Sequence, residues 1–433
     1  MNVLNDLGDQ LIDKWGRLHA RNPRGTPLLP HGHPYTKSRW SFAIAKYQTC
    51  SYKAFHNDKR PRGNVRDLGA AQVRILVLPG DGIGPEITEA TLRALDALSA
   101  RLDLKFDFEE GAIGLKALAE RGTTLPLEVI ERVPGVDGVI LGPVSHYEYP
   151  SRREGGINPS GELRTNFELF ANIRPCRSLS DLSILRQPMD LNIVRENTEG
   201  FYSDRNMVAG TGEFMPDESM ALSVRKITAR ASEQVARAAF DLARGRRKKV
   251  TAVHNANVLK LSDGLFLREV RKVAADYPDV VLEELIVDAT AAHLIRTPDR
   301  FDVIVTTNMF GDILSGEASE LCGSLGLGGS ISVGDGICVA QAQYGSAPDI
   351  AGRNVANPTS LMFSAAMPLD WRGRRDGNKA LIEAAAVLEK AIGKVLGNPA
   401  TRTADLGGSL STDALTDAAC AAVTHSSAAG QAA

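Results

Sequence analysis

Short apolar runs alternate with longer amphipathic segments from residue 73 onward, and this alternation constrains the fold more than any other feature of the chain. A short apolar run bounded by turn residues is typical of a buried strand, and an amphipathic segment is typical of a helix that covers a sheet. Together they predict an α/β architecture. We expect strands at 73–78, 138–141, 191–194, 250–254, 282–287 and 302–306, and helices at 85–98, 231–244, 260–275 and 313–321.

The bulk properties of the 433 residues are those of an ordinary globular protein. A chain of this length predicts two domains or one large split unit. The formal net charge of −2 gives no basis for a surface that binds a polyanion. No apolar run reaches the roughly 18 residues that a membrane span needs. The sequence therefore points away from nucleic-acid binding and from membrane insertion.

The cysteines are odd in number and widely spaced, without a CxxC pair, at Cys50, Cys176, Cys322, Cys338 and Cys420. This usage disfavours a disulfide framework and a structural zinc site, and it indicates a reducing compartment. We therefore expect buried, unreactive thiols. We also expect a location in the cytoplasm, with the mitochondrial matrix as the alternative.

Residues 1–70 differ in composition from the rest of the chain. Basic residues dominate between Arg21 and Arg66, mixed with Pro, Gly, His and Asn, and no hydrophobic periodicity is present. Aspartates interrupt the first turns, whereas transit peptides are poor in acidic residues. We expect a disordered extension or a start site placed too far upstream, in preference to a targeting segment. A second unstructured segment is expected at 424–433.

A glycine-rich loop at 80–85, Gly-Asp-Gly-Ile-Gly-Pro, follows the first predicted strand. A dinucleotide-binding loop of the Rossmann type needs a glycine where Pro85 lies, although an acidic residue follows within range at Glu109 or Glu110. Proline is well suited to the first turn of a helix. The loop by itself leaves a nucleotide-binding role and a structural role open.

Two dense motifs lie between residues 303 and 358. The segment 308–314 reads Asn-Met-Phe-Gly-Asp-Ile-Leu and puts Asp312 at the entrance to a helix. The segment 344–358 is a long loop rich in Gly, Pro and short polar residues, a composition suited to a backbone that wraps a ligand. Together the motifs resemble the isocitrate/isopropylmalate dehydrogenase family, and the resemblance covers roughly residues 73–420.

The resemblance implies an isopropylmalate-dehydrogenase-like fold of two domains, in which helices flank a central mixed sheet, and not a Rossmann fold. It implies a large cofactor-binding domain at 71–169 and 323–423, and a small domain at 170–322. The small domain would carry the dimer interface and an intersubunit arm near 203–224. In this family the loop at 80–85 is structural, and the cofactor lies on the later Gly-Ser-Ala-Pro loop.

Arginines bind the substrate carboxylates in this family, and three of them fall in the matching motifs, at Arg164, Arg174 and Arg195. Guanidinium suits this task because it grips a carboxylate with two donors and stays protonated. Tyr202 ends the third of these motifs and matches the family tyrosine near the transferred proton. The resemblance therefore implies a di- or tricarboxylate substrate.

The residues just before the first arginine distinguish the third substituent of the substrate. Isopropylmalate enzymes carry apolar side chains there, whereas isocitrate enzymes carry a Ser and an Asn. This chain has the same two residue types in swapped order, as Asn158 and Ser160. Both side chains can hydrogen-bond a carboxylate, and neither offers an apolar wall. The motifs therefore favour isocitrate and disfavour isopropylmalate.

The metal and proton chemistry of the family is only partly matched. A Mg²⁺ or Mn²⁺ ion is bound by aspartates, and Asp312 and Asp288 match two of them, Asp288 being supplied by the partner subunit. The position of another family aspartate, one turn after Asp312, is Gly316, and Glu317 lies about 100° further around the helix. The family lysine that relays a proton is replaced by Asn255, which cannot exchange a proton near neutral pH.

The loop at 344–358 implies NAD as the cofactor. Asp349 can accept hydrogen bonds from both ribose hydroxyls and would repel the 2′-phosphate of NADP. Two positions depart from the family, because Gln341 lies where glutamate is usual and Tyr344 where histidine is usual. The remaining cofactor-binding residues that the resemblance implies are Gly345, Ser346, Ala347 and Asn357.

Three functional hypotheses follow from the resemblance and its departures. The first is NAD-dependent oxidative decarboxylation of isocitrate or a close analogue. The second is a non-catalytic or regulatory subunit of a hetero-oligomeric dehydrogenase, because family sites are shared across a dimer. The third is dehydrogenation of a related 2-hydroxy acid without decarboxylation. In each case we expect a homodimer or a hetero-oligomer with a family relative, because Asp288 would serve the neighbouring site.

Overall fold

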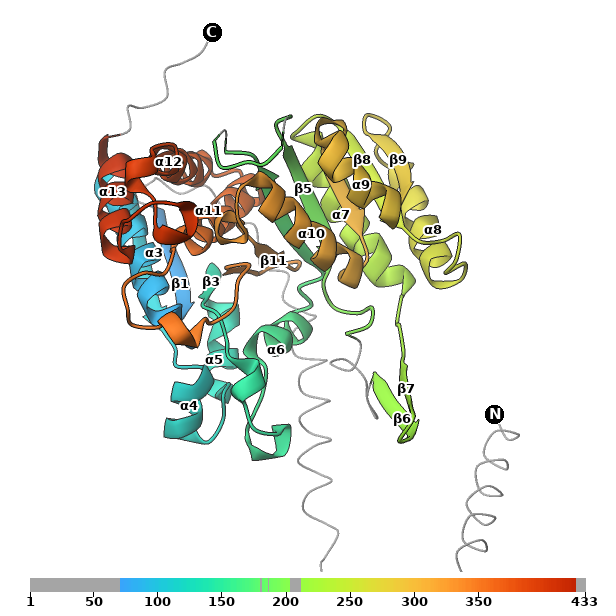
Figure 1. Cartoon of the computed structure of the whole chain (residues 1–433), viewed down its shortest axis with the longest axis horizontal. Helices are drawn as coiled ribbons and strands as arrows, with labels where there is room; N and C mark the ends of the chain where they lie inside the picture. The colour runs from blue at the N-terminus through green and yellow to red at the C-terminus, as the bar shows by residue number, and fades with distance from the viewer. Residues whose placement is uncertain (1–70, 180, 186, 203–211, 426–433) are drawn as a thin grey trace, which may run out of the picture. The chain divides into compact units, whose positions relative to one another are not determined.

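A mixed β-sheet forms the centre of the structure, with helices on both faces (Figure 1). The computed structural model describes residues 71–179, 181–185, 187–202 and 212–425. Among these residues, ten strands share one sheet in the order β2-β1-β3-β12-β11-β4-β5-β10-β8-β9. The predicted extension at 1–70 and most of the predicted tail lie outside the described residues.

The strands of this sheet are β1 (Ala71–Leu78), β2 (Leu104–Glu110), β3 (Gly138–Leu141), β4 (Ala171–Arg177), β5 (Asp190–Glu196), β8 (Lys249–His254), β9 (Val281–Ile286), β10 (Val303–Thr306), β11 (Ile331–Val333) and β12 (Cys338–Gln341). The helices are α3 (Gly84–Arg101), α4 (Gly114–Arg121), α5 (Leu127–Arg132), α6 (Pro159–Asn166), α7 (Ala229–Arg244), α8 (Ser262–Ala274), α9 (Val287–Arg296), α10 (Asn308–Cys322), α11 (Thr359–Asp376), α12 (Lys379–Leu396) and α13 (Thr412–His425).

The sheet has two halves that are supplied by different parts of the chain. Residues 71–169 and 323–423 supply β2, β1, β3, β12 and β11, and residues 170–322 supply the other five strands. The halves meet where β11 pairs antiparallel with β4, over Ile331↔Ile173 to Val333↔Ala171. The described residues all fall within one compact unit, and the two halves form one continuous sheet.

Apolar stripes on the helices explain how they cover the sheet. In α12 the buried positions Leu381, Ala384, Ala385 and Leu388 follow the spacing of one helix face. This helix packs with α3, α11 and α13 into one core beside β1. A separate core lies beside β8 and β10, where α7 and α8 pack. The predicted α/β fold with a mixed sheet is confirmed.

The predicted elements are present, but two boundaries were wrong. Helix α10 begins at Asn308 and not at residue 313, so Asp312 lies in its second turn and not at its entrance. Helix α13 extends through His425, two residues into the segment that we expected to be unstructured. The strands β2, β4, β11 and β12 of the sheet and the helices α4, α5, α6, α9, α11, α12 and α13 were not predicted.

An exposed hairpin of β6 (Glu213–Asp217) and β7 (Met220–Ser223) stands away from the sheet (Figure 1). Every residue of both strands is exposed, and the apolar ones include Phe214, Met215 and Met220. The hairpin falls within the predicted intersubunit arm, of which residues 203–211 lie outside the described part. Within that part, no helix is long and apolar enough to cross a membrane.

Candidate active site

Two buried arginines and one aspartate meet where the sheet is covered by α10. Arg195 Nη1 donates a short hydrogen bond to Asp312 Oδ1, and Arg174 Nη1 lies 3.2 Å from the same oxygen. The side chain of Arg195 is 4% exposed and that of Arg174 is 11% exposed, whereas that of Asp312 is 40% exposed. Two of the three predicted substrate arginines therefore converge on the predicted metal aspartate.

Local backbone geometry brings Arg195 and α10 together. Arg195 lies at the end of β5, opposite Thr306 of β10, and α10 follows β10 almost directly. Asn308 Oδ1, in the first turn of α10, accepts hydrogen bonds from Arg195 Nε at 2.9 Å and Nη2 at 2.7 Å. A Cβ on Gly311 would lie only 2.6 Å from Arg195 Cβ. The glycine thus permits the close approach that seats the guanidinium against the helix.

The arginine pair makes this part of the site electropositive. Burial, together with the neighbouring Arg174, lowers the pKa of Arg195 to about 10. Burial also lowers the pKa of Arg174, and Asp312 opposes that change. Both guanidinium groups stay protonated near neutral pH, so two positive charges face one carboxylate. The remaining charge favours an anionic ligand at the exposed side of Asp312.

The third predicted arginine, Arg164, lies on another helix, α6. Asn158 caps α6, because its Oδ1 accepts from the Gly161 N–H at 3.1 Å, and Pro159 follows as the first residue. Ser160 Oγ donates to Gln341 Oε1 at 2.9 Å, which joins α6 to the end of β12. Arg164 lies four residues after Ser160, on the same helix face. This face of α6 therefore turns toward the strand that enters the predicted cofactor loop.

The predicted cofactor loop is braced by the loop at 80–85. The carbonyl of Ser346 accepts from the Ile83 N–H at 2.8 Å, and Ser145 Oγ donates to Ser346 Oγ at 2.8 Å. Asp81 is 5% exposed and accepts from the N–H groups of Leu115 and Ser145. The hydrogen bonds of the loop at 80–85 thus match the structural role that the resemblance implied.

Two residues of the cofactor loop have side chains that are already engaged. Tyr344 Oη donates to the carbonyl of Asn357 at 2.7 Å, and Asn357 Nδ2 donates to Asp405 Oδ2 at 2.9 Å. Asn357 Oδ1 also accepts from the Thr359 N–H at the start of α11. These bonds close the two ends of the loop onto each other. Neither side-chain group is held ready for adenine in this conformation.

The other predicted cofactor residues lie along the turn of the same loop. Ala347 adopts a left-handed conformation with φ of 37°, just before a short 3₁₀ turn at Pro348–Ile350. Asp349 is exposed on that turn, and so is Gly345 before it. The Asp349 side chain is therefore accessible from solvent.

The residues present supply only part of a metal site. Asp312 is the one predicted aspartate next to the arginines, and Asp288 is exposed in the first turn of α9. Within the described part of the chain, no three His, Cys, Asp or Glu side chains group closely enough to hold a metal ion. A Cβ on Gly316 would meet no neighbouring heavy atom within 4 Å, so space exists there for the carboxylate that the chain lacks. Of the two predicted metal ligands, only Asp312 therefore lies beside the arginine pair.

Helix α10 turns one polar stripe toward the site and another face away from it. Ser315 accepts from Arg174 Nη1 at 2.8 Å, and Ser319 Oγ donates to Gln343 Oε1 beside the cofactor loop at 2.9 Å. Glu317 is four residues after Ile313, whose side chain is 61% exposed, so it lies on the outer face. Burial raises the pKa of Glu317. This position argues against Glu317 as a replacement for the missing aspartate.

Asn255, at the lysine position, is held by a buried ion pair that the sequence did not reveal. Its N–H donates to Asp263 Oδ2 at 2.6 Å, and Asp263 forms an ion pair with Arg225. The side chain of Asp263 is 0% exposed and that of Arg225 is 9% exposed. Arg225 Nη2 also donates to Thr307 Oγ1 at 2.9 Å, directly before α10. The pair therefore ties the Asn255 loop to the helix that carries Asp312.

Tyr202 and two buried glutamates complete the neighbourhood of Arg195. The Tyr202 ring centroid lies 5.9 Å from Arg195 Cζ. Glu196 accepts from the N–H groups of Thr198 and Glu199, and burial raises its pKa. Burial also raises the pKa of Glu199 to about 7. Both glutamates lie in the same motif as Arg195. The sequence did not predict that they would be buried.

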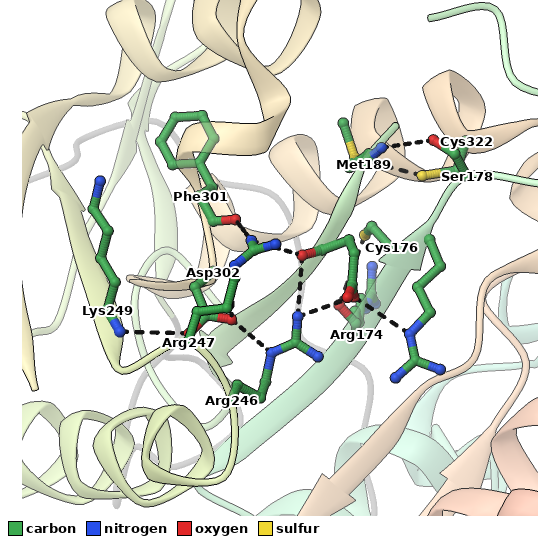
Figure 2. A network of polar contacts seen from close by, with 12 residues as sticks. Arg174, Cys176, Ser178, Met189, Arg246, Arg247, Lys249, Phe301, Asp302 and Cys322 are labelled. Carbon is green, nitrogen blue, oxygen red and sulfur yellow. Dashed lines mark hydrogen bonds and ion pairs between the residues drawn. The ribbon is translucent and has the colours of Figure 1, made fainter. Parts of the chain in front are cut away.

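A basic run at 244–249 is neutralised and provides no second anion site. Figure 2 shows Arg246 turned toward Asp302, and Arg246 Nε donates to Asp302 Oδ1 at 2.7 Å. Lys249 contacts Asp302 only through its backbone N–H, and its Nζ forms an ion pair with Glu283 at 3.0 Å. Arg247 donates to backbone carbonyls, including that of Phe301. The positive charges of this run are paired with carboxylates of the same protein, so they are not available to bind an anion.

Cys176, Cys322 and Cys338 are buried as free thiols, as expected, and Cys420 is half-buried. Burial raises the pKa of all of them, to about 12 for Cys322 and Cys338. Cys176 follows Arg174 on β4, and Cys322 lies against Met189 (Figure 2). These thiols are therefore unreactive core residues. Cys50 lies outside the described residues.

Comparison with known proteins gives the same family as the site residues. The profile described as isocitrate/isopropylmalate dehydrogenase matches residues 74–422. The chain is 41% identical over 347 residues to isocitrate/homoisocitrate dehydrogenase of Thermus thermophilus, covering 80% of this chain and 97% of that protein. It is 38% identical over 336 residues to 3-isopropylmalate dehydrogenase of Saccharolobus solfataricus, covering 78% and 95%.

A solved structure agrees with these sequence matches. The crystal structure of isocitrate dehydrogenase from Methylococcus capsulatus is similar with a TM-score of 0.71 at 34% identity, covering 81% of this chain and 99% of that one. The protein is therefore a member of the isocitrate/isopropylmalate dehydrogenase family.

Proposed function

We propose that this chain catalyses the NAD-dependent oxidative decarboxylation of a 2-hydroxy-3-carboxy acid, isocitrate or a close analogue in preference to 3-isopropylmalate. The observation that carries the proposal is the convergence of Arg174 and Arg195 on Asp312, two buried cations beside one exposed carboxylate. Relatives with both substrate names are about equally similar to the chain, so the choice rests on the residues before Arg164. Asn158 and Ser160 are polar, which suits a third carboxylate.

Each group near the arginines has a proposed task. Arg174 and Arg195 bind the substrate carboxylates, and as fixed cations they stabilise negative charge that develops on the substrate. Tyr202, next to Arg195, is the candidate to give or accept the proton. Asp349 accepts hydrogen bonds from the adenosine ribose of NAD and repels the 2′-phosphate of NADP.

A Mg²⁺ or Mn²⁺ ion would be bound by Asp312, by Asp288 of a second copy and by substrate oxygens. When bound, such an ion polarises the 2-hydroxyl and stabilises the enolate that follows loss of carbon dioxide. Because Asp312 already forms ion pairs with two arginines, this chain would depend strongly on the substrate to complete the coordination. The proposal therefore includes metal binding that is weak without substrate.

Exposed apolar side chains support the proposal of a dimer or a hetero-oligomer. The hairpin β6–β7 exposes Met215 and Phe214, and Leu261, next to the Asn255 loop, is 90% exposed. Large exposed apolar side chains of this kind are typical of surfaces that a partner covers. A partner that covers Leu261 would lie against the loop that holds Asn255.

The second candidate function is a regulatory subunit that binds substrate without turning it over. Asn255 cannot exchange a proton, and Gly316 has no metal-binding oxygen, although a Cβ at Gly316 would meet no neighbouring atom within 4 Å. The arginine pair that binds an anion is nevertheless intact. Dehydrogenation without decarboxylation is the third candidate, because it needs less from the metal and proton groups.

The test is NADH formation by the purified full-length chain with Mn²⁺, NAD and a panel of 2-hydroxy di- and tricarboxylates. We expect turnover of isocitrate and an increase in kcat of about 10²-fold or more in Asn255→Lys, because the variant restores a proton-exchanging group. Asn257→Lys is the matched control, since it adds the same charge at an exposed position of the same loop. No turnover by the wild type, with activity only on mixing with a relative that carries the lysine, would select the regulatory subunit.

A further inference from the structure

Asn172 is a buried polar residue in the middle of the sheet, beside both arginines of the site. It lies on β4 two residues before Arg174, so the two side chains point to the same face of the strand. In the sheet it pairs with Arg195 of β5 on one side and with Ser332 of β11 on the other. Its exposed fraction is 2%. A buried amide needs partners for both its oxygen and its nitrogen, so the bonds of Asn172 indicate its role.

The oxygen of this amide helps to fix the orientation of the Arg174 guanidinium. Asn172 Oδ1 accepts from Arg174 Nε at 2.7 Å. Arg174 Nη1 donates to Ser315 Oγ at 2.8 Å and lies 3.2 Å from Asp312 Oδ1. Because a guanidinium is planar, fixing Nε and Nη1 also fixes the direction of Nη2. Among the described residues no partner is found for Nη2, so its N–H groups are the donors that remain for a ligand carboxylate.

The nitrogen of the same amide is held from the other half of the sheet. Arg174 Nε can only donate, so the Asn172 atom that faces it is the oxygen, and Nδ2 points toward β11. There Nδ2 donates to the Ser330 hydroxyl at 2.9 Å, the Ser332 hydroxyl at 3.2 Å and the Ile331 carbonyl at 3.3 Å. These acceptors belong to the half that also carries the predicted cofactor loop. The orientation of Arg174, which lies in the half at 170–322, is therefore linked to β11 across the junction of the two halves.

We propose that Asn172 is a positioning residue, which holds Arg174 in the orientation that binds a substrate carboxylate and takes its own position from β11. The inference rests on the proposed function, which assigns Arg174 to the substrate. Arg195 is held by Asn308 of its own half, so the two arginines are oriented from different parts of the sheet. Without Asn172, Arg174 Nε would lose its acceptor in a buried position, and the guanidinium would rotate toward another one.

Calorimetric titration of the full-length chain with isocitrate, in the presence of Mg²⁺, tests this role without requiring turnover. In Asn172→Leu, which removes the acceptor and adds no charge, we expect the affinity for isocitrate to fall about 10- to 100-fold, because a hydrogen bond to a charged group is lost. Asn197→Leu is the matched control. Asn197 is 3% exposed and also donates to Ser332 Oγ at 3.2 Å, but no described hydrogen bond joins it to Arg174. This control should lose a comparable amount of stability in chemical denaturation and keep its affinity within about threefold of the wild type.

Two further variants separate positioning from a general disturbance of the sheet. On an Arg174→Met background, Asn172→Leu should have almost no further effect on isocitrate affinity, because it acts through the arginine. If Asn172→Leu does not fold, Asn172→Ala provides the same comparison, with an expected loss of about 3- to 10-fold because water can replace part of the lost bond. Equal losses of affinity in the Asn172 and Asn197 variants, or no loss in either, would overturn the role of Asn172. Failure of the wild type to bind any acid of the panel would overturn the proposed function instead.

Discussion

Two glycines of α10 offer a direct measure of how tightly Arg195 is packed. Gly316 lies in the helix interior, and a Cβ there would meet no neighbouring heavy atom within 4 Å. Gly311 lies in the same helix, and its Cβ would come within 2.6 Å of Arg195 Cβ and 2.7 Å of Arg195 Cγ. Glycine lowers helix stability to a similar extent at both positions. Only Gly316 has room for a methyl group.

The expected stabilities follow from these two environments. Gly316→Ala should raise the free energy of unfolding by about 0.5–1 kcal/mol, because alanine is the better helix former. Gly311→Ala gains the same helical term and loses about 1–3 kcal/mol to overpacking against a buried side chain. The helical term cancels in the comparison, so the two variants should differ by about 1–3 kcal/mol, with Gly311→Ala the less stable.

Guanidinium denaturation followed by far-ultraviolet circular dichroism measures both variants, at one protein concentration because association adds to apparent stability. Gly311→Ala should also weaken anion binding, since the added methyl group moves Arg195 away from Asn308. Equal stability of the two variants, or a loss of stability in Gly316→Ala, would refute the assignment of open space at Gly316 and close packing at Gly311.

Two more outcomes are expected from buried charges. Arg225→Met should lower the free energy of unfolding by about 3–5 kcal/mol in chemical denaturation, because it leaves Asp263 buried without its partner. Arg230→Met, which breaks an exposed ion pair with Glu168, should lower it by less than about 1 kcal/mol. Similar losses in the two variants would contradict a stabilising role for the buried ion pair. Burial raises the pKa of Glu199 from 4.5 to about 7. Between these pH values the folded state therefore binds more protons than the unfolded state. The free energy of unfolding of the wild type should fall as pH rises from 4.5 to 7. Glu199→Gln should remove part of this slope in melts at pH 5 and pH 8, and an unchanged slope would count against the raised pKa.

Six of the ten strands of the sheet could be predicted from the sequence, because they contain short runs of mainly apolar residues. The runs at Gly138–Leu141 and Val303–Thr306 are buried at every position, and both were expected as strands. Strand β2 alternates apolar and polar residues through Leu104–Glu110, a usable signal that was overlooked. Strand β11 has only three residues, which is too short for any pattern. Helix α11 contains Pro368, which weakens its helical signal.

The part of the site that could be predicted consists of residues that belong to short sequence motifs. Arg174, Arg195 and Asp312 were expected together and lie together. The contacts that no local pattern can reveal join distant segments, such as the bond from Ser160 to Gln341, 181 residues apart. Asn158 was expected to bind substrate, and in the structure its side-chain Oδ1 caps α6. Its amide nitrogen remains the only side-chain donor that it could offer to a ligand.

The width of the sheet varies in a way that bears on how the protein can move. The ladders β3–β12, β12–β11 and β11–β4 each contain three residue pairs, whereas β1–β2 and β4–β5 each contain seven. A strip of short ladders bends more easily than the broad flanks on either side of it. Gln341 lies on β12, and the short ladders β12–β11 and β11–β4 separate it and Ser160 from the Arg174–Arg195 pair. Flexing at the strip would therefore change the spacing between the two groups of ligand-binding side chains while each group keeps its own geometry.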